Sequence, residues 1–200
     1  MTRVTGIYAA ADHPGPLDKA DSQTLKLLFD SVFPEYFRKA GAPENARLAP
    51  SWAMMTQNPE LALRLVRLSD YIISDMPWSK RADLRQLMTQ AVNLHFMCEY
   101  AHQVHFDVSR NAGISAELQA ALPFWRTSGL FNDEQRTVIE FTHAAIDGTV
   151  SDELFAKVVS LFGEKGTIEF TVATAYMSFW AIILNTLRPE LHLTSPKSGD

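Results

Sequence analysis

The sequence contains very little cysteine, with Cys98 the single one among 200 residues. One thiol cannot form a disulfide within the chain, and it cannot build a cysteine-rich metal site. Basic residues are not in excess, because the formal net charge is -5. Nucleic-acid binding relies on clustered Lys and Arg that neutralise phosphates, so we expect no nucleic-acid partner.

Long apolar runs are also scarce. Residues 1–16 lack the apolar stretch of a signal peptide. The longest apolar stretch, 173–187, is interrupted by Thr174, Ser178 and Asn185, and it predicts a buried helix rather than a membrane span. A lone thiol without an export signal predicts a cytoplasmic protein that does not bind membranes.

Cofactor-binding motifs are missing from the sequence. We find no phosphate-binding loop, no dinucleotide fingerprint and no Ser-centred nucleophile elbow. The prediction is therefore a protein without a cofactor.

Strand patterns are nearly absent, whereas apolar residues recur at helical spacing along most of the chain. Asn58-Pro59, Asn132 with Gln135, and Gly113 are typical of helix ends. The fold class predicted is an all-α bundle of about seven to eight helices in a single domain. We expect a flexible arm over 1–17, the helical domain over 18–190 and a tail over 191–200. The expected helices cover 21–31, 46–56, 59–72, 80–111, 115–122, 132–147, 151–162 and 165–187, and Pro34 is expected to end the first.

Four residues with reactive side chains fall within eleven positions: His95, Cys98, His102 and His105. Their spacing would place them on one face of an uninterrupted helix. Imidazoles transfer protons near neutral pH, and a thiol beside them can become nucleophilic. The segment thus has the ingredients for acid–base or thiol chemistry.

Structural interpretations of the same residues remain open. A free cysteine is often a small buried hydrophobe, and a single histidine more often makes structural hydrogen bonds than performs catalysis. Four ligands on one helix cannot surround an ion tetrahedrally, so we expect no metal site.

Residues 83–92, 98–105 and 111–115 resemble the core of the carboxymuconolactone decarboxylase and alkylhydroperoxidase D (AhpD) superfamily. Residues 131–135 and 176–185 resemble its later helices, so the resemblance covers roughly 20–190. It implies the AhpD-like helical fold, self-association as a homotrimer or homohexamer, and a helix break just before Cys98.

The resemblance also assigns roles. Cys98 corresponds to the first motif cysteine and His105 to the motif histidine, whereas Ala101 occupies the second cysteine position and Gln86 that of the relay glutamate. The disulfide cycle of the peroxidase branch cannot operate with one thiol. The decarboxylase-like branch needs no cysteine pair. The residues that match that branch or flank its motif are Glu99, Tyr100, His102 and His105, with Arg85 and Gln86 as candidates for substrate binding.

Three functions follow as hypotheses. The first is His105-centred acid–base chemistry on a small oxo-acid, lactone or aromatic ring-cleavage product, assisted by Glu99, His102 and Tyr100. The second is a one-cysteine peroxidase that uses Cys98 and His105. The third is a binding or scaffold protein that has the fold without the chemistry. In the first two, the partner is a small-molecule substrate.

Overall fold

The computed structural model describes residues 2–39 and 47–190, and the predicted tail over 191–200 lies outside them. The regular secondary structure within these ranges consists of α-helices and short 3₁₀- or π-helical turns, with no strand. The all-α prediction is therefore confirmed. The described residues group into two compact units, where the sequence predicted one helical domain. The first unit contains residues up to 68 and from 187, and the second contains 69–186.

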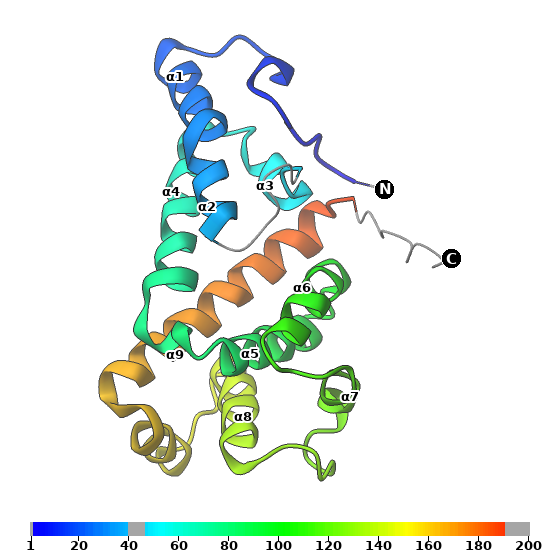
Figure 1. Ribbon diagram of the computed structural model, residues 1–200, viewed down its shortest axis with the longest axis vertical. Coiled ribbons are helices and arrows are strands. Elements are labelled where there is room, and N and C mark those ends of the chain that lie inside the picture. Colours follow the sequence, from blue (N-terminus) through cyan, green and yellow to red (C-terminus); the bar gives the residue numbers. More distant parts are fainter. Residues whose placement is uncertain (1, 40–46, 191–200) are drawn as a thin grey trace. The chain divides into compact units, whose positions relative to one another are not determined.

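The first unit is built from four helices (Figure 1). They are α1 (Lys19–Leu27), α2 (Phe33–Lys39), α3 (Pro50–Met55) and α4 (Pro59–Asp70), the last of which continues into the second unit. Residues 5–8 are anchored to α3, since the Ile7 backbone N–H donates to the Ala53 carbonyl (2.8 Å) and Ile7 is only 1% exposed. The sequence did not indicate this anchoring for the expected arm.

Pro34 does not end the first helix, contrary to the prediction. A π-helical turn, Leu28–Val32, follows α1 and leads directly into α2. Pro34 is then the second residue of α2. The helix continues past this proline because the π-helical turn before it shifts the backbone hydrogen bonds by one residue, as in the bond from the Phe33 N–H to the Leu28 carbonyl.

The second unit contains the segment that carries the candidate site. Its helices are α5 (Ala82–His95), α6 (Glu99–Asn111), α7 (Ala116–Ala121), α8 (Asp133–Asp147) and α9 (Asp152–Leu187, in this unit up to Thr186). In Figure 1, α5 lies beside α6 and α8. The apolar residues Leu84, Met88 and Val92 of α5 are fully buried in one cluster with residues of α6, α8 and α9. Nine of the fourteen residues of α5 are buried, and none is exposed.

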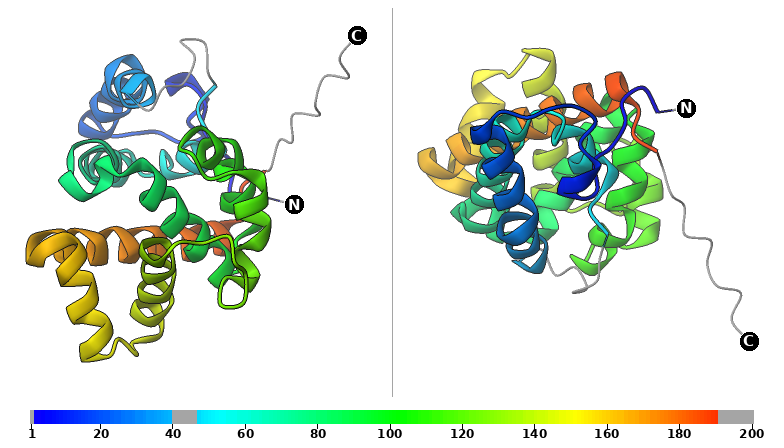
Figure 2. Two further views of the ribbon diagram at one scale, coloured as in Figure 1. Left: turned by 60° about the horizontal axis from the view of Figure 1, so that its bottom comes forward. Right: turned by 90° about the horizontal axis from the view of Figure 1, so that it is seen from above.

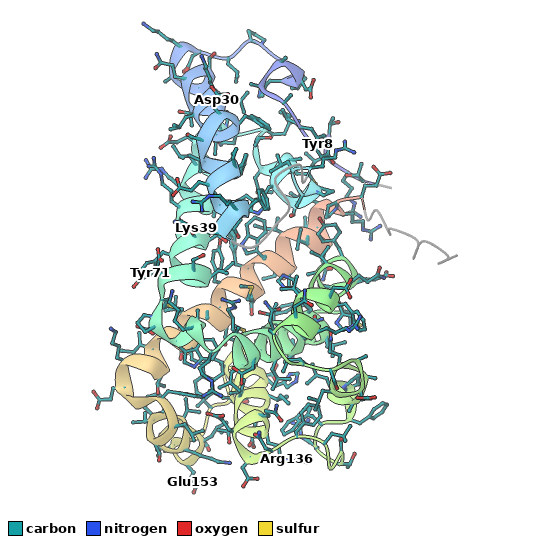
Figure 3. The ribbon with its side chains drawn as sticks, viewed as in Figure 1. Tyr8, Asp30, Lys39, Tyr71, Arg136 and Glu153 are labelled. Atoms are coloured by element: carbon teal, nitrogen blue, oxygen red, sulfur yellow. The ribbon has the colours of Figure 1, made fainter. Side chains whose placement is uncertain are left out.

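Several predicted helix ends are confirmed. Asn132 and Gln135 form a capping box at the start of α8, and the Asn58 side chain accepts from the Leu61 N–H at the start of α4. Gly113 has φ 94 just after α6. Arg136 of α8, labelled in Figure 3, donates to the carbonyls of Trp125, Ser128 and Phe131, which fixes the loop before this helix.

α9 bends at Gly163, which has non-helical backbone angles (φ 69, ψ 171), and the two arms diverge in both views of Figure 2. The sequence predicted separate helices on either side of this point. Among the described helices, α9 alone is long and apolar enough to span a membrane, judged by length and composition only. Half of the 18-residue segment of α9 that meets this test is buried inside the protein.

Candidate functional site

The corner between α5 and α6 separates the reactive residues of the motif. α5 ends at His95, Met97 adopts a left-handed conformation (φ 50), and Cys98 is the N-cap of α6. The break before Cys98 agrees with the resemblance, whereas the uninterrupted helix over 80–111 is wrong. The corner directs α6 back along α5, so residues of the two helices face one another in antiparallel order.

His105 is held by Gln86 of α5. The distance between His105 Nδ1 and Gln86 Oε1 is 3.1 Å, and the Ser109 hydroxyl donates to the same oxygen (3.3 Å). A carboxamide oxygen only accepts hydrogen bonds, so His105 must donate through Nδ1. The hydrogen bond of the His105 ring to the other described residues is made through Nδ1 and not through the remaining nitrogen, Nε2.

Burial lowers the pKa of His105 to about 4, and the positive charges of Arg85 and His102 act in the same direction. The residue as a whole is half-buried. His105 is therefore neutral near pH 7 and retains the lone pair of Nε2.

A second glutamine, Gln90, continues this polar layer one turn further along α5. His102 Nδ1 lies 3.1 Å from Gln90 Oε1, and Asn93 Nδ2 donates to the same oxygen (3.0 Å). Gln90 Nε2 donates to the His102 carbonyl and to Gln119 Oε1 of α7. Burial also lowers the pKa of His102. Buried networks of this kind fix side-chain orientation when every member is paired.

Cys98 lies in the hydrophobic core and is 1% exposed. Burial raises the pKa of its thiol, and the nearby Ala101 N–H only partly opposes this. His105 is seven residues further along α6, about 10 Å along the helix axis. Ala101, at the second motif position, lies one turn from His105. The thiol thus lacks the low pKa and the exposure of a reactive cysteine.

Glu99 and Tyr100 occupy the first turn of α6. Glu99 is exposed and accepts from Gln103 Nε2 (3.0 Å). Tyr100 is partly buried and packs against the hydrophobic core. The hydrogen bond of Glu99 thus stays within α6, whereas His105 is bonded to Gln86, which in turn accepts from Ser109.

Arg85 is fixed by backbone carbonyls. Its Nη1 donates to the carbonyls of Ile73 (2.6 Å) and Ser79 (3.1 Å). These bonds make Arg85 part of a structural network of hydrogen bonds to the backbone. Its charge also contributes to the low pKa of His105, so the two side chains share one electrostatic environment.

His95 joins a different cluster from the other motif residues. Its Nδ1 lies 3.2 Å from Nδ1 of His143 on α8, and its Nε2 lies 3.4 Å from Asp147 Oδ1. Trp125 stacks on the His143 ring (centroids 6.3 Å apart, interplanar angle 9°). The pair joins residues 48 positions apart, so no local spacing could have indicated it. The described residues contain no group of three or more His, Cys, Asp or Glu suited to a metal ion.

Comparison with known proteins gives one structural match to report. The fold is similar to the crystal structure of a protein of unknown function from Agrobacterium tumefaciens, described as a candidate antioxidant defence protein, AhpD. The TM-score is 0.60 at 21% sequence identity, over 70% of this chain and 95% of the other. No family model and no curated protein matches the sequence. The chain therefore has an AhpD-like all-α fold.

Proposed function

We propose that the protein is an acid–base enzyme acting on a small oxo-acid, lactone or aromatic ring-cleavage product. The observation that carries this proposal is the environment of His105. Gln86 holds its Nδ1–H, so Nε2 retains the lone pair, and burial keeps the ring neutral. A neutral imidazole with a fixed tautomer can accept a proton from a bound substrate.

The surrounding residues support a substrate that is or becomes anionic. The charge of Arg85 acts on His105, and the same charge would stabilise a substrate carboxylate or an enolate formed by proton removal. Gln86 and Ser109 keep the His105 ring in one orientation while the proton moves. His102, held by Gln90, is the second imidazole close to this site.

A substrate screen tests the proposal. We expect removal of the proton next to the carbonyl of a 3-oxo acid or an unsaturated lactone carboxylate, measured as exchange of that proton for solvent deuterium or as a change in ultraviolet absorbance. His105→Gln should lower kcat by about 100-fold or more, the usual contribution of a general base. Glu99→Gln is the matched control on the exposed face and should retain activity within about threefold. Unchanged activity of His105→Gln would contradict the proposal.

A binding protein without chemistry is the second candidate. The low pKa of His105 favours it, because a weak base removes protons slowly at neutral pH. In that case the same acids would bind saturably without turnover, and His105→Gln would weaken binding only modestly. Ligand-observed NMR measured alongside the activity assay separates the two outcomes.

The burial of Cys98 favours acid–base chemistry over a one-cysteine peroxidase. We expect hydrogen peroxide to oxidise Cys98 no faster than it oxidises a free cysteine, as followed by intact-mass spectrometry. Cys98→Ser should leave turnover of the acid substrate within about threefold. Rapid, stoichiometric oxidation that requires His105 would instead support the peroxidase.

We also propose a cytoplasmic homotrimer or homohexamer. Three apolar side chains on α6, Val104, Phe106 and Val108, are exposed, and Phe124 after α7 is exposed as well. Exposed apolar patches are typical of protein interfaces. Sedimentation velocity should show an oligomer at micromolar concentration, and a monomer at all concentrations would contradict this part.

A further inference from the structure

Two buried glutamine side chains connect α5 and α7 inside the second unit. Gln90 of α5 is fully buried, and Gln119 of α7 is only 3% exposed. Gln119 Nε2 donates to the backbone carbonyls of Phe106 and Ile114 (both 3.1 Å). Because a carbonyl only accepts hydrogen bonds, these two contacts require the nitrogen of the Gln119 amide and direct its oxygen toward Gln90. The backbone therefore determines the orientation of the Gln119 side chain.

The orientation of the Gln90 amide is determined in the same way. Its Nε2 donates to Gln119 Oε1 (3.0 Å) and to the His102 backbone carbonyl (3.1 Å). An amide turned by half a rotation would bring its oxygen against these two oxygens, without a proton between them. Gln90 Oε1 must therefore point the other way, where Asn93 Nδ2 (3.0 Å) and His102 Nδ1 (3.1 Å) lie.

This arrangement fixes the position of the proton on the His102 ring. Because Gln90 Oε1 only accepts, Nδ1 of His102 must carry the proton. Burial lowers the pKa of His102, so the ring is neutral near pH 7 and its Nε2 retains the lone pair. In water, a neutral histidine side chain instead carries its proton mainly on Nε2. The network thus selects the tautomer that is less common in solution.

We propose that Gln90 and Gln119 are positioning residues that hold His102 in its Nδ1–H tautomer. Nε2 of His102 then serves as a second proton acceptor beside His105. The two histidines are three residues apart on α6, so they are neighbours on one face of the helix. Each donates its Nδ1–H to a glutamine of α5, His105 to Gln86 and His102 to Gln90. The charge of His102 also acts on His105.

A fixed tautomer affects the rate because only the nitrogen with the lone pair can take a proton from a substrate. The proton leaves a carbon atom of the substrate, its electron pair remains there as an enolate, and the proton binds to Nε2 of the imidazole. A His102 ring with its proton already on Nε2 could not perform this step. The acceptor role rests on the acid–base function proposed above, whereas the tautomer does not.

The tautomer is measured directly by NMR of the full-length protein labelled with ¹⁵N-histidine. Long-range ¹H–¹⁵N spectra near pH 7 distinguish protonated from unprotonated ring nitrogens. We expect His102 of the wild type to have a protonated Nδ1 and an unprotonated Nε2. Gln90→Met removes the acceptor and keeps the length of the side chain, so the proton should move mainly to Nε2. Gln119→Met removes the anchor of Gln90 and should give a mixture of both tautomers.

Gln103→Met is the matched control. Gln103 is the neighbour of His102 on α6, but its side chain donates to Glu99 (3.0 Å), so the His102 tautomer should not change. His105, held by Gln86, is the internal control in every spectrum. A wild-type His102 with its proton on Nε2 would overturn the proposal, as would an unchanged tautomer in folded Gln90→Met. The wild-type spectrum decides the tautomer even if a variant does not fold.

The acceptor role is tested by deuterium exchange, with 3-oxobutanoate as the probe. We expect Gln90→Met to lower kcat about tenfold or more, because it misplaces the proton of His102, and to leave KM within about threefold. Gln103→Met should leave both constants within about threefold. Unchanged kcat in a Gln90→Met protein with an altered tautomer would overturn the acceptor role. Absence of exchange in the wild type, with this or any other acid of the screen, would overturn the acid–base function and the acceptor role together, while the spectrum still decides the tautomer.

Discussion

The two histidine sites of the second unit differ in what holds each ring. His105 faces the amide oxygen of Gln86, which accepts its Nδ1–H but carries no charge. His143 faces another imidazole, His95, which itself lies 3.4 Å from the carboxylate of Asp147. Burial lowers the pKa of both His105 and His143, but Asp147 partly opposes the effect at His143.

The difference shows that the group beside a histidine ring determines which protonation state of the ring is favoured. An amide fixes the tautomer without favouring the protonated ring, whereas a carboxylate favours it. At the contact between His95 Nδ1 and His143 Nδ1, one ring must donate and the other must accept. The carboxylate of Asp147 lies on the His95 side of this pair.

We expect the largest effect from replacing the uncharged amide beside His105 with a carboxylate. Gln86→Glu places a carboxylate beside His105 Nδ1, which should raise the pKa of His105 by about 2 pH units, a ~100-fold gain in proton affinity. A pH titration of the imidazole carbon signals by NMR measures it. Gln86→Met, which removes the acceptor without adding charge, should not raise this pKa. Equal titration of Gln86→Glu and wild type would show that Gln86 does not control His105.

A smaller effect is expected on stability. His105 has a pKa of about 4 in the folded protein and near 6.5 when unfolded. Between these values the unfolded chain binds more protons, so the free energy of unfolding should rise as the pH increases from 4 to 6.5 and level off above. Because the residue as a whole is half-buried, we expect a contribution of about 1–2 kcal/mol.

Urea unfolding at pH 4.5 and 7 of wild type and His105→Gln measures this contribution. The variant lacks the titrating ring, so its stability should decrease less between pH 7 and 4.5 than that of wild type. The same decrease in both proteins would mean that His105 is not responsible.

The smallest effect is expected at the second site. Asp147→Asn removes the charge that raises the pKa of His143, so this pKa should fall further, by less than 1 pH unit. The change is small because Asp147 is exposed and its charge is screened by solvent and salt. The titration of His105 in the same sample serves as the internal control and should not move. A rise in the pKa of His143 would contradict the geometry.

Local sequence patterns predicted most of the second unit. Caps such as Asn132 and the turn at Gly113 determine helix ends through bonds between neighbouring residues, so a single sequence reveals them. The helix predicted over 80–111 begins only at Ala82, because residues Pro77–Lys80 form a 3₁₀ turn in which Ser79 is buried. Tertiary packing, and not the neighbouring residues, determines this helix start.

The sequence indicated several residues of the candidate site but few of the contacts between them. The resemblance placed His105 at the motif histidine and Gln86 at the position of the relay glutamate, and their side chains lie within hydrogen-bond distance. The Gln90 network with Gln119 and the pairing of His95 with His143 depend on how four helices pack. Such contacts join distant positions, and helical periodicity contains no information about them.

The backbone conformation of the exposed Met97 divides the histidines of the motif between two sites. Its side chain is 86% exposed and its backbone is left-handed, a conformation that costs a non-glycine residue about 1 kcal/mol. In a straight helix, His95 would share a face with His105. Because of this one strained residue at the surface, the eleven positions from His95 to His105 instead contribute to two separate imidazole clusters, and different charges act on the histidines of each cluster.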